Sequence, residues 1–251
     1  MSDVQPTFNL RLLQAISDWQ RSSNARRGKR LKELCADLPA RFRTAHSMCF
    51  RKLNLNKPSV WDLVAEDFLP EKISSWTMDA DITKAFKGGV PEEGWQGVIL
   101  FYVPPPDRVI VNLWALYRER EFIDALNQHK NDIKHYVEGA GKYWNSQSEV
   151  VMEVDAVSQA DIYSLGGYSS SFDSLVRQAA EIIHGRQVTP EQLTELEWRT
   201  EHLRTHAGPR WLTHDATKRV LARTKPHSEE LLRIKQLRPT AATLPAGSCS
   251  S

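Results

Sequence analysis

The sequence predicts an α+β fold in which a strand-rich middle is flanked by helical segments, and three observations support this. Apolar residues recur at helical spacing over residues 1–46. Short apolar runs bounded by turn residues, of which "GWQGVILFYVPPP" is the clearest, occupy residues 47–160. Helical spacing returns over residues 161–237. The 251 residues are 41% hydrophobic and 25% charged, the composition of an ordinary globular protein with a buried core.

Residues 1–46 are predicted to form helices with a basic stretch between them. In "FNLRLLQAISDWQ" an apolar stripe is formed by Leu10, Leu13, Ile16 and Trp19. "LKELCADLPARFRTAHSM" is also helical, in two pieces that are separated at Pro39. The basic stretch contains six cations and no acid: Arg21, Arg26, Arg27, Lys29, Arg30 and Lys32. It can be a solvated surface or a nucleic-acid contact, and the sequence leaves both interpretations open.

The central region begins with alternating strands and short helices. "MCFRKLNL" is predicted as a strand and "SVWDLVAEDFL" as a helix capped by Ser59. "ISSWTMDADITKAFKGG" starts as a strand and continues as a helix that ends at the two glycines. "VILFYV" and "DRVIVNL" are apolar enough to be buried strands.

The central region ends with one amphipathic helix and one acidic strand. The helix is predicted over "LYREREFIDALNQHKNDIKHYVEGAG", and the strand over "YWNSQSEVVMEVD", residues 143–155. Because strand side chains alternate between two faces, Gln147, Glu149, Glu153 and Asp155 should share one face. The acids nearer the end of the strand, Glu153 and Asp155, are expected to be ordinary solvated residues.

The C-terminal region is predicted to be helical over residues 161–237. Its helical segments are "SFDSLVRQAAEIIHG", "TPEQLTELEWRTEHLRTH" and "SEELLRIKQL". Residues 238–251, "RPTAATLPAGSCSS", have the composition of a disordered tail.

Composition and spacing exclude several classes of protein. Three widely spaced cysteines without a C-x-x-C motif argue against a disulfide framework or a zinc site. His202 and His206 stand four residues apart but lack the acid of a metalloprotease motif, so no metal is expected. No signal peptide and no apolar run of membrane-spanning length is apparent, which predicts a cytoplasmic protein without a membrane partner. The net charge of +2 indicates no global field for polyanions.

Three segments of the central region carry the candidate chemistry, in a fixed order. An arginine, Arg51, stands on the first strand; "SSWT" with Ser75 opens the second motif; and "QSEVVMEV" with Gln147 and Glu149 forms the third. This order resembles the mono-ADP-ribosyltransferase superfamily, in its Arg–Ser–Glu, cholera-toxin-like branch with a Gln-x-Glu motif. The resemblance covers roughly Met48 to Asp155, under half of the chain.

The resemblance implies a split antiparallel sheet that binds NAD as the ADP-ribose donor. Arg51 would hold the pyrophosphate or its neighbouring ribose, since guanidinium offers a fixed cationic fork. Ser75 would contact the nicotinamide ribose and steady the catalytic glutamate. Trp76 and Thr77 of the same motif are also candidate NAD-binding residues, with Trp76 either packing beneath the site or belonging to the core. The chain departs from the family pattern at Lys52, where relatives often carry glycine; the Lys52 backbone N–H remains available to the nicotinamide amide.

Glu149 is the candidate catalytic acid. Departure of nicotinamide leaves a sugar cation resembling that of glycoside hydrolysis, and an aimed carboxylate stabilises this charge. Gln147, two residues earlier, would face the acceptor, because an amide can donate to and accept from an amide or a base edge. Glutamine occurs there in relatives that modify asparagine or nucleobases.

The function expected from this resemblance is transfer of ADP-ribose from NAD to a macromolecule by an intracellular toxin of toxin–antitoxin or phage-defence type. The basic segments favour a nucleic-acid acceptor, in RNA or DNA, and an antitoxin or inhibitor protein is an expected partner. ADP-ribosylation of a protein side chain by an effector toxin and a non-catalytic helical interaction protein are the alternatives. A glycohydrolase, in which water replaces the acceptor, is a further outcome.

Overall fold

The computed structural model describes residues 7–92, 94–144, 146–167, 171–185 and 187–237. The predicted tail, residues 238–251, lies outside the described residues. In the N-terminal half the elements are α1 (Leu10–Arg21), α2 (Ala25–Cys35), η1 (Ala40–Phe42), β1 (Cys49–Leu55), α3 (Lys57–Val64), β2 (Leu69–Pro70), β3 (Ile73–Thr77), α4 (Ala80–Ala85), η2 (Phe86–Gly88), β4 (Gln96–Tyr102), η3 (Pro106–Arg108) and β5 (Val109–Asn112). The elements that follow are α5 (Leu113–Leu116), α6 (Arg120–His129), η4 (Tyr136–Glu138), α7 (Ala140–Tyr143), β6 (Glu149–Glu153), β7 (Ala156–Val157), η5 (Gln159–Asp161), β8 (Ile162–Gly167), α8 (Phe172–His184), α9 (Pro190–Thr200), η6 (Glu201–His206), β9 (Arg210–Trp211) and α10 (His214–Leu237).

The centre of the fold is a seven-stranded antiparallel sheet with the order β5-β6-β3-β1-β4-β8-β9, so the protein is of mixed α+β class as predicted. β1 pairs with β4 along its whole length, from Cys49 opposite Tyr102 to Leu55 opposite Gln96. Its pairing with β3 consists of one residue pair, Phe50 opposite Thr77. The sheet therefore divides into two blocks at the β1–β3 junction.

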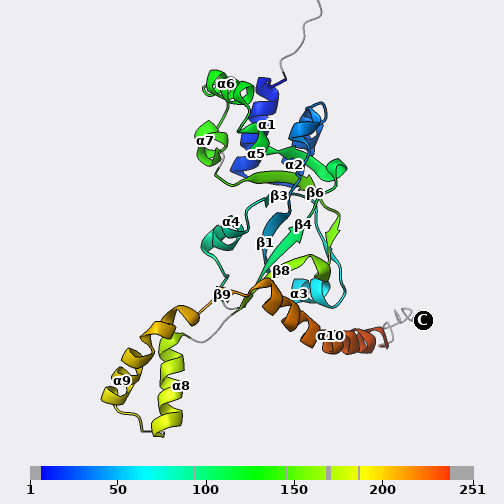
Figure 1. Ribbon diagram of the computed structural model, residues 1–251. Helices are drawn as coiled ribbons and strands as arrows, with labels where there is room; N and C mark the ends of the chain where they lie inside the picture. The colour runs from blue at the N-terminus through cyan, green and yellow to red at the C-terminus, as the bar shows by residue number, and fades with distance from the viewer. Residues whose placement is uncertain (1–6, 93, 145, 168–170, 186, 238–251) are drawn as a thin grey trace, which may run out of the picture.

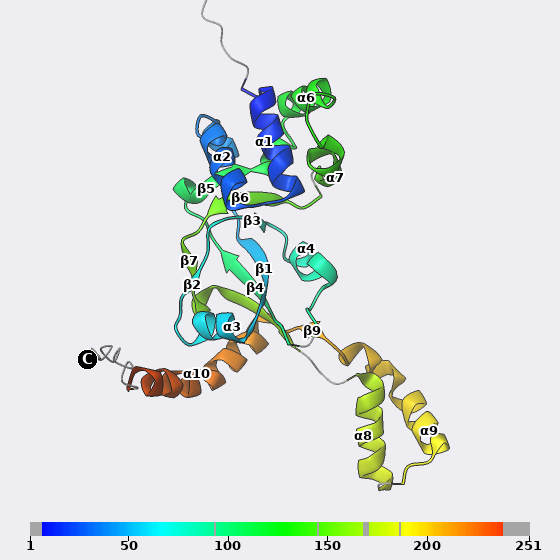
Figure 2. The same ribbon diagram turned by 180° about the vertical axis from the view of Figure 1, so that it is seen from behind.

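Each face of the β3–β6 block is covered by a separate hydrophobic core. Val151 belongs to the core formed with α1, α2, α5 and α6, in which Leu13 and Ile16 are fully buried. Val150, Met152 and Trp76 belong to the core on the opposite face. In Figures 1 and 2, α1, α2, α6 and α7 gather at the β5–β6 end of the sheet. The α8–α9 hairpin and α10 project from the other end, in different directions.

The structure corrects several predicted boundaries. The cap of α3 is Asn56, whose side chain accepts from the Ser59 backbone N–H, so Ser59 lies inside the helix. The single long helix predicted over residues 116–141 is instead α6, η4 and the start of α7. The first of these ends at His129, and His135, just before η4, has a left-handed φ of 58°. The predicted strand 143–155 begins only at Glu149, because Tyr143 ends α7 and Ser148 has φ 45°.

The sheet also continues beyond residue 160, where the sequence pattern placed the end of the central region. β8 pairs with β4, and β9 pairs with β8 through Gly166 and Gly167. These strands lie inside the region predicted as helical, 161–237. The segment was missed because β8 ends in two glycines, which are uncommon inside strands, and because β9 has two residues.

Candidate active site

Ser75 and Glu149 come from adjacent strands and share one face of the sheet. Thr77 lies opposite Glu149 and Ser75 lies opposite Val151, so Ser75 is the diagonal neighbour of Glu149. This face is the one that α1 covers, since Val151 packs in the same core as Leu13 and Ile16. The register of β3 and β6 thus places a hydroxyl beside a carboxylate, under the end of α1.

A cavity of about 540 Å³ opens at this point of the sheet. This volume is suited to a small organic ligand. Its lining is drawn from α1 and the residues after it, β1, β3, the α4–η2 segment, α7, and β6 with the turn before it. All the site residues predicted from the sequence line it: Arg51, Lys52, Ser75, Trp76, Thr77, Gln147 and Glu149.

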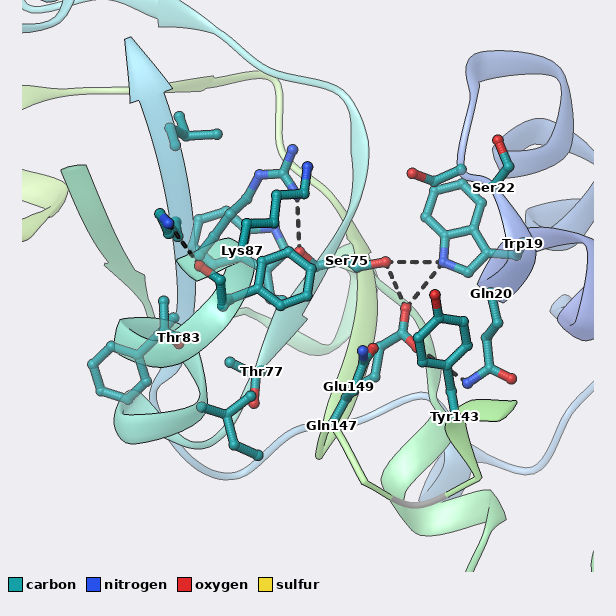
Figure 3. A pocket seen from close by; sticks show the side chains of 18 of the residues that line it. Trp19, Gln20, Ser22, Ser75, Thr77, Thr83, Lys87, Tyr143, Gln147 and Glu149 are labelled. Atoms are coloured by element: carbon teal, nitrogen blue, oxygen red, sulfur yellow. Dashed lines mark hydrogen bonds between the residues drawn. The ribbon is translucent and has the colours of Figure 1, made fainter. Parts of the chain in front are cut away.

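Glu149, Ser75 and Trp19 form a closed triangle of hydrogen bonds. Ser75 Oγ donates to Glu149 Oε1 at 2.5 Å, and Trp19 Nε1 donates to Ser75 Oγ at 3.0 Å and to Glu149 Oε1 at 3.2 Å. Figure 3 shows the three side chains turned toward one another, with Gln20 and Tyr143 beside the carboxylate. Because these groups come from α1, β3 and β6, segments distant in sequence fix the carboxylate.

Gln20 contacts the second oxygen of the same carboxylate. Its Nε2 donates to Glu149 Oε2 at 3.3 Å, and its Oε1 accepts from the Tyr117 hydroxyl at 2.8 Å. Trp19, Gln20 and Tyr117 were not predicted as site residues. Trp19 appeared only as the last position of an apolar stripe, and no local pattern marks a glutamine or a tyrosine whose partner lies about a hundred residues away.

Burial raises the pKa of Glu149, a residue that is 6% exposed. Hydrogen bonds from Ser75, Gln20 and Trp19 act in the opposite direction and lower this pKa, since all three donate to the carboxylate. Removing a carboxylate from water is costly unless it is hydrogen-bonded, and here both oxygens have donors. A carboxylate held in this way can stabilise a positive charge that develops next to it.

Arg51 reaches the triangle through the backbone of Ser75. Its guanidinium NH1 donates to the Ser75 carbonyl at 2.9 Å, and its Nε lies 3.0 Å from Glu71 Oε2 in a half-buried ion pair. Arg51 thus spans the split between β1 and β3. Two of the guanidinium N–H groups are therefore used in contacts inside the protein, and only the remaining N–H groups of Arg51 can bind a ligand.

Lys52, Thr77 and Trp76 have mainly internal partners. The Lys52 Nζ donates to the backbone carbonyls of Phe86 and Gly89, which holds η2 over β1. Burial and the charge of Lys87 lower the pKa of Lys52. Thr77 Oγ1 accepts from the Asp79 N–H at 3.1 Å. Trp76 is buried in the core on the opposite face, and its indole donates to Ser74 Oγ.

Gln147 lies in the turn before β6 rather than on the strand. The predicted strand alternation between Gln147 and Glu149 is therefore wrong. The two residues are joined by a turn at Ser148, and both line the cavity. In Figure 3 Gln147 lies next to Glu149. Glu153 and Asp155 lie apart from the cavity and form surface ion pairs with Lys32 and Arg108.

Within the part of the chain that the structure describes, no three His, Cys, Asp or Glu side chains are grouped as metal ligands. In the same residues no helix has the length and apolar character needed to span a membrane.

Comparison with protein-family models, with curated proteins and with solved structures found no match to this chain. An assignment of function depends on the residues of the pocket.

Proposed function

We propose that this protein is an NAD-dependent mono-ADP-ribosyltransferase with Glu149 as its catalytic acid. The observation that supports the proposal is the linked set Arg51–Ser75–Glu149: three residues from three strands, joined by hydrogen bonds, in one cavity. The same three residues carry the sequence resemblance to the Arg–Ser–Glu branch. Neither the order of the motifs nor the spacing of the residues requires them to meet, so their meeting favours a shared site over three unrelated surface residues.

The pocket offers the groups that this reaction needs. In the reaction the bond between the ribose C1′ and the nicotinamide nitrogen breaks, and its electron pair leaves with nicotinamide. The acceptor then bonds to C1′ and loses a proton. Glu149 would stabilise the positive charge on the sugar, and the cations in the lining would attract the anionic dinucleotide. These cations are Arg21, Arg51, Lys52 and Lys87.

The proposed acceptor is a nucleic acid. Ser22 and Ser23 line the cavity and lead directly into α2, whose solvent-facing Arg26, Lys29 and Arg30 are exposed and form no ion pair among the described residues. Free cations beside a pocket suit a phosphate backbone. An amide side chain of a protein is the competing acceptor, and Gln147 could contact either one.

The proposed setting is an intracellular toxin of toxin–antitoxin or phage-defence type, acting in the cytoplasm and held in check by an antitoxin or inhibitor protein. A non-catalytic interaction protein is the rival account. It gives no reason for a buried carboxylate with donors on both oxygens at the wall of a cavity, which is a costly arrangement for a purely structural role.

Incubation of the purified protein with labelled NAD and cell lysate, followed by separate nuclease and protease digestion, tests the proposal. Label that nuclease removes identifies a nucleic-acid acceptor, and label that protease removes identifies a protein. Nicotinamide release without label indicates a glycohydrolase. Absence of both label and nicotinamide release would contradict the enzyme assignment.

A further inference from the structure

We propose that Trp19 and Gln20 of α1, with Tyr117 behind them, are positioning residues for the Glu149 carboxylate: Trp19 anchors Oε1, and Gln20 orients Oε2, which keeps room for a ligand. The catalytic consequence of this inference rests on the proposed function, whereas its structural content concerns the carboxylate alone. The N-terminal helix is then part of the site rather than a separate appendage.

The anchored oxygen is Oε1, because its hydrogen-bonding capacity is filled. It accepts from Ser75 Oγ at 2.5 Å and from Trp19 Nε1 at 3.2 Å. A carboxylate oxygen accepts about two hydrogen bonds in its plane, so no further donor is expected at Oε1. Trp19 is fully buried in the core under α1, which fixes the direction of its N–H.

The offered oxygen is Oε2, which has one long hydrogen bond, from Gln20 Nε2 at 3.3 Å. One acceptor position of Oε2 is left for a donor from a ligand, such as a sugar hydroxyl. Figure 3 shows the carboxylate lying between the Ser75–Trp19 pair and the Gln20 amide, with Tyr143 and Gln147 close by.

Tyr117 determines which end of the Gln20 amide faces the carboxylate. The Tyr117 hydroxyl donates to Gln20 Oε1 at 2.8 Å, so the amide nitrogen is left to face Glu149. The opposite orientation would place the amide oxygen against the carboxylate oxygen. The Tyr117 ring is itself fixed, being buried and packed edge-on against Phe122 at 5.3 Å between centroids.

The same contacts control the charge of Glu149. Burial raises its pKa, and the donated hydrogen bonds oppose that rise, so loss of any donor should shift the carboxyl further toward its protonated form. The pKa of Tyr117 is also raised, first by burial and then by the negative charge of the neighbouring Glu149. The other titratable groups around this cavity lie on α1, β1, η2 and α7: Arg21, Arg51, Lys52, Lys87 and Tyr143.

The direct test is the titration of Glu149 by carbon NMR of protein labelled at the glutamate carboxyl, with the signal assigned by its absence in Glu149→Gln. Trp19→Phe, Gln20→Leu and Tyr117→Phe each remove one polar group from the set. Gln14→Leu is the matched control, since Gln14 lies on the same helix but bonds to the backbone of Lys134. We expect the Glu149 carboxyl to titrate at higher pH in the three variants than in the wild type, and at the wild-type pH in Gln14→Leu.

The kinetics of NAD turnover are a second measurement, which depends on the proposed function as the titration does not. If NAD is turned over, kcat should fall about tenfold to a hundredfold in Trp19→Phe and Gln20→Leu, less in Tyr117→Phe, while KM for NAD changes little. The acid limb of the pH profile of kcat should move to higher pH in each variant, together with the pKa of the Glu149 carboxyl. Tyr117→Phe keeps the buried ring and so remains informative if Trp19→Phe fails to fold. An unchanged titration in folded Gln20→Leu and Tyr117→Phe would overturn the inference. A shifted titration in a protein that never consumes NAD would reject the proposed function alone.

Discussion

The Ser75 hydroxyl donates to Glu149 Oε1 at 2.5 Å, while the adjacent Ser74 hydroxyl, on the opposite face of β3, accepts from Trp76 Nε1 at 2.9 Å. Two neighbouring serines thus serve different parts of the molecule. Ser75 belongs to the cavity, and Ser74 belongs to the core that contains Trp76.

These two serines give a matched pair of variants. Ser75→Ala should lower kcat about tenfold to a hundredfold, because the carboxylate keeps the Trp19 bond but loses its shortest one. Ser74→Ala should leave kcat unchanged but lower the free energy of unfolding by about 1–3 kcal/mol, since the buried Trp76 N–H loses its acceptor. Thermal melts and initial rates of both variants check this. A loss of kcat in Ser74→Ala without one in Ser75→Ala would show that Ser75 is not the serine of the site.

Arg51 has a structural role, in its contacts with Glu71 and Ser75, and a proposed NAD-binding role, and the two can be tested separately. Arg51→Met should destabilise the fold by about 3 kcal/mol, because Glu71, with a side chain 8% exposed, is left without its cation. Arg51→Met with Glu71→Met should recover most of that stability. NAD affinity, measured by calorimetry, should stay about tenfold to a hundredfold weaker in both. Full recovery of NAD binding in the double variant would limit Arg51 to a structural role.

The raised pKa of Glu149 predicts a pH-dependent stability difference. The folded protein keeps a proton on Glu149 that the unfolded chain releases at lower pH, so the free energy of unfolding falls as pH rises from the unfolded to the folded pKa. Glutamine does not titrate. The melting temperature of Glu149→Gln minus that of the wild type should therefore increase as the pH is raised through and above the ordinary glutamate range, from about pH 4 upward. A difference that is constant or that shrinks over this range would contradict the raised pKa.

Gln147 should influence the acceptor more than the donor. It lines the cavity from the turn before β6, and within the described part of the chain the hydrogen bonds to the Glu149 carboxylate come from Ser75, Trp19 and Gln20. Gln147→Ala should lower transfer of labelled ADP-ribose about tenfold while leaving hydrolysis of NAD by water nearly unchanged. Parallel assays of label transfer and nicotinamide release provide the comparison. Equal loss of both reactions would remove the acceptor role.

The sequence predicted the two strands that carry Ser75 and Glu149 more accurately than it predicted the elements that pack around them. Ser75 and Glu149 stand on short strands with clear apolar neighbours, "ISSWT" and "EVVME", which are recognisable locally. The contribution of α1 could not be predicted, because the bond from Trp19 to Glu149 joins residues 130 positions apart. The turn at Ser148 was also missed, since a positive φ at a residue other than glycine has no reliable sequence signal.

The pairing of Arg51 with Glu71 shows another limit. The sequence led to the prediction that Arg51 binds the ligand, but gave no sign that the short β2–β3 connection supplies an acid to it. Which partners a long cationic side chain finds depends on the split between β1 and β3, and that split follows from a single residue pair in the register.

Nicotinamide release from NAD by the purified protein, with Glu149→Gln and Glu153→Gln measured side by side, tests the proposed activity of the cavity most directly. Both substitutions replace a glutamate of β6 by its amide, but Glu149 lies in the cavity and Glu153 pairs with Lys32 on the surface. Glu149→Gln should lower the rate by about a hundredfold to a thousandfold, and Glu153→Gln should retain the wild-type rate. A folded Glu149→Gln variant that releases nicotinamide as fast as the wild type would contradict the central claim.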